Sequence, residues 1–452
     1  MHQSLSTSPA AARWLAHPQR WMLAAVLVGL VLRLSFALGY WVGKPLTLDE
    51  QEYLLLARSL AEGRGFTYEV PGESEPPRRH VGRAPLYPVF LAAILVVSGG
   101  SNTAEVGHAT DSASAPPGGH SGPVSARALT AVKFTQAVVG ALSLWLIGVL
   151  ATRIAGPTAG VVAASVGAVY PPLVWICGYM LSETLFSALA LGGALLLDIA
   201  LDRDAASRWR MALAAGAVVG LATLARPAMM AFLMLATVFL FVRRQPALAV
   251  ALLAGAAIVI SPWTIRNARE HGRFVLVASE GGVTFWTGNH PLARGDGDMA
   301  ANPAIKRDYL AIEARFPGLT AEEMEPIYYG EALRFIAAHP LEWAGLLARK
   351  LFYAVVPMGP SYRLHSNRYV AASVLPYLCV LPFAVAGILR LRRQPCPPRA
   401  LWLMAASAVV VSLVFFPQER FRIPVIDPTL IVCAAAWWAG SPRVAAVLER
   451  LR

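Results

Sequence analysis

Long apolar runs separated by short polar segments dominate this chain. An α-helix of about 20 apolar residues is long enough to cross a bilayer. Runs near that length lie at 21–41, 126–151, 158–181, 184–201, 211–225, 228–242, 246–263, 370–389, 400–416 and 425–440. The pattern predicts an all-α polytopic membrane protein.

Two further apolar stretches are ambiguous. Residues 85–98 are too short for a full crossing, which favours a half-span or a re-entrant segment. Residues 342–358 carry Arg349 and Lys350 among apolar positions, which is typical of an interfacial helix or of a span broken at Pro357. With these two stretches included, the chain has about 10–12 expected transmembrane helices.

The polar segments divide the chain into four parts. Residues 1–20 form a basic tail, which we expect to be cytosolic. We expect residues 21–263 to form an N-terminal transmembrane module, the candidate catalytic part if the protein is an enzyme, with an external loop at 42–84, and residues 264–340 to form a small extracytoplasmic domain. Residues 341–452 add interfacial and transmembrane helices. Arginines in the short loops on the opposite side support this orientation; they include Arg208, Arg210, Arg243, Arg244, Arg390 and Arg392.

The region 264–340 is the one sizeable polar segment. Gly281-Gly282 and Gly288-Asn289 are typical of turns, while 303–315 and 320–338 have helical patterns. About 75 residues can bury only a marginal core, so we expect this region to pack onto the membrane helices.

Composition narrows the functional classes. The chain is 56% hydrophobic and 15% charged, and its net charge of +12 follows the short-loop arginines, so it does not indicate nucleic-acid binding. The four cysteines, Cys177, Cys379, Cys396 and Cys433, form no CxxC pair, so neither a disulfide framework nor a zinc site is expected. Arg33 lies inside the first span, either as a functional group or as a side chain that reaches the interface.

Three carboxylates crowd into four positions just after the first span, at Asp49, Glu50 and Glu52. Thr47 followed by Glu50 three residues later predicts a capping box at the start of a short helix, and Gly63 with Gly65 ends it. If Glu50 completes the cap, Asp49 is the carboxylate left for chemistry. The alternative is that all three acids only cap and solvate a surface helix.

Several motifs, in order along nearly the whole chain, resemble one family. The first-loop motif runs Asp49-Glu50-x-x-Tyr53 to Gly65-Phe66 and continues at Pro85-Leu86-Tyr87-Pro88. The later motifs are Leu181-Ser182-Glu183-Thr184, Arg226-Pro227, Pro262-Trp263-Thr264-Ile265-Arg266-Asn267 and Arg420-Phe421-Arg422-Ile423-Pro424. Together they resemble GT-C membrane glycosyltransferases, in particular the bacterial group similar to protein O-mannosyltransferases and to the lipid A aminoarabinose transferase.

The resemblance implies a GT-C-type helical bundle and an inverting sugar transfer. The donor would be a polyprenyl-phosphate sugar, and the acceptor a hydroxyl of a glycan, a lipid or a protein. The resemblance gives Asp49 the role of general base, for which we expect a pKa raised in a partly dry site. Glu50 and Glu183 complete the candidate catalytic carboxylates. Glu183 would orient the acceptor, or bind a divalent cation with Asp49, although no motif requires a metal.

Guanidinium groups suit a lipid phosphate, because they pair with it through two hydrogen bonds. Candidates at external membrane boundaries are Arg83, Arg226, Arg266, Arg420 and Arg422. Anchoring to lipid headgroups is the alternative for each. Tyr53, Tyr87, Trp263 and Trp286 would stack on a sugar or form an interfacial aromatic belt.

We expect a bacterial plasma-membrane protein with an extracytoplasmic site, in contact with membrane lipid and with no nucleic-acid partner. A flippase or transporter of lipid-linked sugars and a non-catalytic assembly subunit are the alternatives. The absence of an internal sequence repeat and the boundary position of the acids argue against a transporter.

Overall fold

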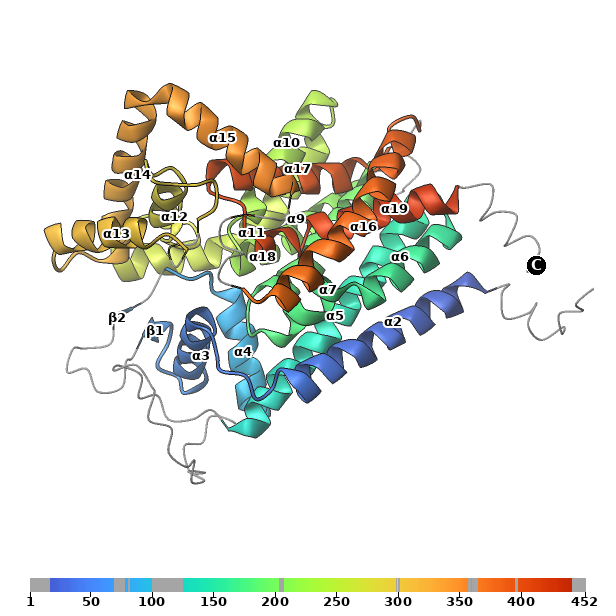
Figure 1. Cartoon of the computed structure of the whole chain (residues 1–452), viewed down its shortest axis with the longest axis horizontal. Coiled ribbons are helices and arrows are strands. Elements are labelled where there is room, and N and C mark those ends of the chain that lie inside the picture. The colour runs from blue at the N-terminus through green and yellow to red at the C-terminus, as the bar shows by residue number, and fades with distance from the viewer. Residues whose placement is uncertain are drawn as a thin grey trace, which may run out of the picture.

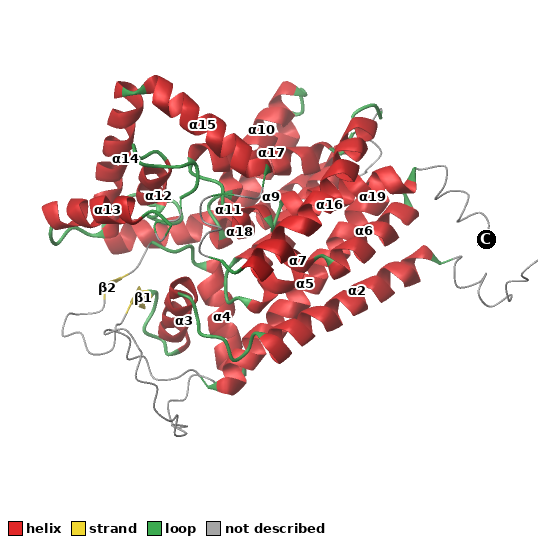
Figure 2. Ribbon diagram, in the orientation of Figure 1, coloured by secondary structure: helices red, strands yellow, loops and turns green. Residues whose placement is uncertain are grey.

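The computed structural model describes residues 17–68, 78–79, 82–99, 125–202, 207–297, 299, 301–356, 359, 365–394 and 397–440. The first 16 residues of the predicted tail, Pro357 and Cys396 lie outside the described residues. Within the described part, helices make up the fold, apart from an antiparallel pair of two-residue strands, β1 (Thr67–Tyr68) and β2 (Arg78–Arg79) (Figures 1 and 2).

Among the residues that the structure describes, five helical segments are long and apolar enough to cross a membrane. They are α2 with its π-helical extension (Pro18–Tyr40), α5 (Ala126–Ala155), α8 (Glu183–Leu201), α11 (Pro246–His271) and α16 (Asn367–Leu391). Four shorter apolar helices accompany them: α4 (Leu86–Val97), α10 (Met229–Val242), α17 (Arg399–Val414) and α19 (Ile426–Ala439). The chain is therefore an all-α polytopic membrane protein, as the hydropathy pattern predicts. The number of crossings stays a prediction.

The run at 158–181 is not one straight span. It forms α6 (Pro157–Val169) and α7 (Pro171–Trp175), with a 3₁₀ turn at Ile176–Gly178, and the two parts meet at 67°. Tyr170 adopts an extended conformation with ψ of 108°, because a residue before proline is disfavoured in the helical region. The apolar run at 158–181 is therefore a bent pair of helices rather than one straight helix.

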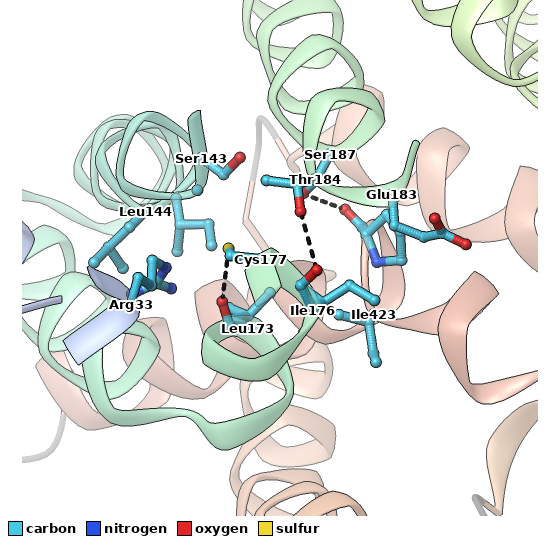
Figure 3. A pocket seen from close by; sticks show the side chains of 13 residues that line it. Arg33, Ser143, Leu144, Leu173, Ile176, Cys177, Glu183, Thr184, Ser187 and Ile423 are labelled. Atoms are coloured by element: carbon cyan, nitrogen blue, oxygen red, sulfur yellow. Dashed lines mark hydrogen bonds between the residues drawn. The ribbon is translucent and has the colours of Figure 1, made fainter. Parts of the chain in front are cut away.

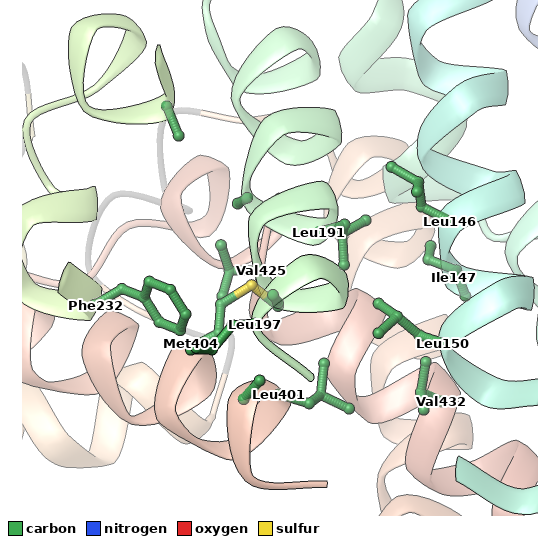
Figure 4. Packing of buried hydrophobic residues seen from close by; sticks show 14 of the residues in the cluster. Leu146, Ile147, Leu150, Leu191, Leu197, Phe232, Leu401, Met404, Val425 and Val432 are labelled. Carbon is green, nitrogen blue, oxygen red and sulfur yellow. The ribbon is translucent and has the colours of Figure 1, made fainter. Parts of the chain in front are cut away.

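Small residues let the helices pack closely. The largest buried cluster joins α5, α8, α9 (Arg208–Ala225) and α19, with Ile147, Leu191 and Val432 fully buried in it (Figure 4). Between α9 and α11 the backbones touch: a Cβ on Gly216 would meet the Leu252 carbonyl oxygen at 2.0 Å. Such contact is typical of membrane helices, where packing rather than water exclusion drives association.

The polar region 264–340 contributes α12 (Gly281–Gly288), α13 (Pro303–Arg315) and α14 (Ala321–Ala338), followed by α15 (Pro340–Val355). The two glycine pairs mark the ends of helix α12 rather than separate turns. Figure 1 places α12–α14 at the same end of the bundle as α3 (Leu48–Ala61) and α4, opposite the start of α2 and the end of α19. In α15, Lys350 is buried and donates to Asn289 Oδ1 at 3.0 Å, which explains a cation among its apolar residues.

Candidate functional site

The capping box at the start of α3 forms as predicted. Glu50 Oε2 accepts from the Thr47 amide at 2.8 Å, and the Thr47 hydroxyl accepts from the Glu50 amide. Glu50 Oε1 accepts from the Met180 amide at 2.8 Å, and the residue is 1% exposed. Both oxygens of Glu50 are therefore occupied, Oε2 in the cap of α3 and Oε1 in joining α3 to the segment before α8. Its predicted catalytic role finds no support in these contacts.

Asp49, one position earlier, faces two arginines. Its Oδ1 accepts from Arg83 Nη2 at 2.8 Å and its Oδ2 from Arg420 Nη1 at 2.5 Å. Burial alone would raise the pKa of Asp49, but the charges of Arg420 and Arg83 outweigh it and lower the pKa to about 2. The raised pKa expected from the sequence is thus wrong for the unliganded site, because two guanidinium groups stabilise the carboxylate.

Arg83 lies among three carboxylates. Besides Asp49, it contacts Glu52 on α3 and, through Nε at 3.1 Å, Glu280 at the N-cap of α12. Desolvation raises the pKa of Glu280 to about 7; Arg83 opposes the rise, and Glu52 and Asp49 add to it. Because 43% of the Glu280 side chain stays exposed, water screens part of this effect.

A second ion pair adjoins the first cluster. Glu183, the first residue of α8, pairs with Arg226 at 2.5 Å and is 2% exposed. The ring of Phe421 connects the two clusters, since the guanidinium carbons of Arg226 and Arg420 lie 4.8 and 5.4 Å from its centroid. The Glu183 and Asp49 charges both act on Arg420. The structure thus brings the two predicted acids to one site.

This proximity bears on the topology of the first module. Two residues at one site lie on the same side of the membrane, so an even number of membrane crossings must separate them. Three helical units lie between Asp49 and Glu183, namely α4, α5 and the bent pair α6–α7. Helix α4 has 12 residues, far fewer than the roughly 20 needed to span. The half-span prediction for 85–98 is consistent with this length and stays a prediction.

The predicted aromatic contacts are mostly internal. Tyr87 is fully buried and donates to Gln136 Oε1 at 2.8 Å, while Tyr53 packs edge-on against Tyr87 with centroids 4.9 Å apart. Trp286 is 3% exposed and packs on His290. With this burial, Tyr87 and Trp286 present no open ring face to a sugar. Tyr53 instead supports the Arg83 guanidinium, which lies 5.2 Å from its ring centroid.

Two of the predicted phosphate arginines make other contacts. Arg266 donates to Asn267 Oδ1 at 3.1 Å and lies over the ring of Trp263. Arg422 is 5% exposed and pairs with Asp427. The three arginines that share the Asp49 and Glu183 site are Arg83, Arg226 and Arg420.

Arg33 does not reach the interface. It is 1% exposed and donates to the carbonyl oxygens of Gly29 at 2.9 Å and Gly167 at 3.3 Å. Figure 3 shows it at one side of a narrow internal pocket beside Cys177, with Glu183 at the other side. The interface-reaching alternative for Arg33 is therefore wrong.

Among the described residues, no group of three or more His, Cys, Asp and Glu side chains is arranged to hold a metal ion. The carboxylates of Asp49 and Glu183 each contact arginine. Sequence reasoning did not select Glu280, Phe421 or Asp427. Glu280 directly precedes the Gly281-Gly282 pair, and Phe421 lies between the candidate arginines Arg420 and Arg422. Their position next to these residues is the sequence feature that could have identified Glu280 and Phe421.

One solved structure with a similar fold is the archaeal oligosaccharyltransferase AglB from Archaeoglobus fulgidus, in complex with an inhibitory peptide and a dolichol-phosphate. It matches with a TM-score of 0.56 and 15% identity, over 96% of this chain and 51% of that chain. The chain shares the fold of this oligosaccharyltransferase. The apo form of the same archaeal enzyme gives a TM-score of 0.54 at 16% identity, over 92% of this chain and 50% of that chain.

ArnT from Cupriavidus metallidurans bound to undecaprenyl phosphate gives a TM-score of 0.43 at 14% identity, over 92% of this chain and 77% of that chain. The present chain spans about half the length of the oligosaccharyltransferases that it matches. No protein-family model and no curated protein sequence matches the chain.

Proposed function

We propose that this protein is an inverting glycosyltransferase, which moves a sugar from a polyprenyl-phosphate donor to an acceptor hydroxyl. The observation that carries the proposal is the carboxylate of Asp49 held between Arg83 and Arg420, with Arg226 and Glu183 beside it. The archaeal enzyme that shares the fold was solved with a dolichol-phosphate, which supports a lipid-phosphate donor.

The arginines match the charge change of such a reaction. The donor is a phosphodiester with one negative charge, and the departing polyprenyl phosphate gains a second as the anomeric C–O bond breaks. Guanidinium groups that approach this phosphate stabilise the charge where it develops. Arg83, Arg226 and Arg420 are the proposed phosphate ligands.

Asp49 has the role of proton acceptor in this proposal. The acceptor hydroxyl attacks the anomeric carbon from the face opposite the phosphate, which inverts the configuration, and its proton passes to the Asp49 carboxylate. With a pKa of about 2, Asp49 is a weak base while both arginines contact it. When a phosphate takes over Arg83 and Arg420, the stabilising charge is shared, so the pKa of Asp49 rises. The base therefore becomes effective only when the donor is bound.

The proposal also assigns a role to Glu183 and a side of the membrane to the site. Glu183 orients Arg226 through their ion pair, rather than binding a metal with Asp49. We place the site on the extracytoplasmic face of a bacterial plasma membrane, where the acceptor is a glycan, a lipid or a protein.

A panel of polyprenyl-phosphate sugars tests the function. Purified protein is incubated with each donor, with membrane extract as the acceptor source, and release of polyprenyl phosphate is measured. We expect release from one donor class. Transport of donors across proteoliposome membranes without any release would instead show a flippase.

A further inference from the structure

Two arginines of one short helix point to different partners. Helix α18 (Glu419–Arg422) has only four residues. Arg420 reaches Asp49 on α3, 371 positions away in the sequence. Arg422, two residues later, turns into the bundle and contacts Asp427 in the first turn of α19. The helix therefore presents one guanidinium to the site and buries the other.

Arg422 and Asp427 form a buried ion pair. Arg422 Nε lies 2.8 Å from Asp427 Oδ1, and Arg422 Nη2 donates to Oδ2 at 3.4 Å. Tyr170, at the break between α6 and α7, donates its hydroxyl to the same Oδ2 at 3.1 Å. The Arg422 guanidinium also lies 4.1 Å from the ring centroid of Tyr377 on α16. Asp427 is 1% exposed and Arg422 5%.

The connection between α18 and α19 is held from another side as well. The Ser187 hydroxyl on α8 donates to the Pro424 carbonyl oxygen at 2.9 Å. Helices α8 and α16 thus contact the segment that carries Arg420 directly, and the α6–α7 break contacts Asp427, the partner of Arg422.

A buried ion pair adds little to stability on its own, because desolvation of both charges offsets their attraction. A four-residue helix is also not stable in isolation. An arginine side chain loses rotamer entropy when it is fixed in one orientation. The Arg422–Asp427 ion pair therefore fixes the orientation of α18 rather than adding to the stability of the fold.

We propose that Asp427, acting through Arg422, is a positioning residue that holds α18 and so directs Arg420 toward the lipid phosphate. This inference rests on the proposed function, because it takes Arg420 as a phosphate ligand. It also replaces the earlier expectation that Arg422 itself binds substrate.

A double-mutant cycle tests the inference. Binding of a polyprenyl monophosphate is measured on the full-length purified protein and on the Asp427→Asn, Arg420→Ala and double variants. We expect Asp427→Asn to weaken binding roughly 10-fold, comparable with Arg420→Ala, and to cause no further loss when Arg420 is already alanine. A purely structural role would lower the melting temperature without this non-additivity. Asp198→Asn is the matched control, since Asp198 pairs with Arg153 in an exposed ion pair and should leave binding unchanged.

A second variant tests the inference if the Asp427→Asn protein does not fold. Arg422→Met with Asp427→Leu replaces the pair by apolar side chains, a change that proteins often tolerate. This variant should fold, yet bind polyprenyl monophosphate roughly 10-fold more weakly. Unchanged binding in it, or additive losses in the cycle, would overturn the positioning role alone. If Arg420→Ala itself leaves binding unchanged, the phosphate role of Arg420 fails, and the positioning role fails with it.

Discussion

Replacement of Asp49 by asparagine perturbs the centre of the site with little change of shape. It removes the negative charge that Arg83 and Arg420 contact, and it removes the proton acceptor of the proposed reaction. Turnover is expected to fall roughly 10²–10⁴-fold, the range that general-base catalysis contributes.

The same substitution should have the opposite effect on donor binding. A pKa of about 2, below the ordinary value of 3.8, corresponds to a favourable interaction on the order of 2 kcal/mol between the Asp49 carboxylate and its surroundings. A donor phosphate must compete with this carboxylate for Arg83 and Arg420. Asparagine competes far less, so donor affinity should stay equal or increase, by at most about one to two orders of magnitude.

The assay measures the turnover number and the donor dissociation constant separately, on purified and well-folded protein. Glu50→Gln is the neighbouring comparison. It should cost far less turnover and act mainly on stability, because Glu50 caps α3 and accepts from the Met180 amide. Unchanged turnover in Asp49→Asn would refute the base assignment. A large loss only in Glu50→Gln would move that role to Glu50.

Three further expectations concern other parts of the molecule. Arg420→Ala should weaken donor binding by roughly 1.5–3 kcal/mol. Arg420→Lys should restore binding only in part, because lysine lacks the two-pronged geometry of the guanidinium group. An unchanged dissociation constant for polyprenyl phosphate in the Arg420→Ala protein would contradict this. Because the folded-state pKa of Glu280 is raised from 4.5 to about 7, stability falls as pH rises through that window, so Glu280→Gln should melt higher than the unmodified protein at pH 8 but not at pH 4. Cysteines introduced at Ala321 and Arg243 into a cysteine-free background should react with an impermeant reagent in intact cells only at Ala321, and the reverse pattern would invert the proposed orientation.

Local features of the structure were predictable from the sequence because they depend on residues close together in the chain. The capping box needs only Thr47 and Glu50 three positions apart, and the end of α3 needs only Gly63, whose φ is +75°. The identity of the candidate acids Asp49 and Glu183 also followed from their place beside apolar runs. Their meeting at one site was not derivable from spacing, since 134 positions separate them and the crossings between were ambiguous.

The remaining features depend on long-range packing. Periodicity does not show that Asp49 meets Arg420 across 371 positions, and this contact reverses the expected direction of its pKa shift. Hydropathy alone treats 158–181 as one run, although Pro171 forces the extended conformation of Tyr170. Glu280 belongs to a segment that looked like a turn, so its contact with Arg83 became visible only in three dimensions.

The most direct test follows a single turnover with a sugar-labelled polyprenyl-phosphate donor. We predict that each polyprenyl phosphate released is matched by one labelled sugar on the acceptor, with inverted anomeric configuration. Asp49→Asn should bind the donor at least as tightly but release polyprenyl phosphate roughly 10²–10⁴-fold more slowly. Retention of configuration, or release at the unmodified rate from the Asp49→Asn protein, would contradict it.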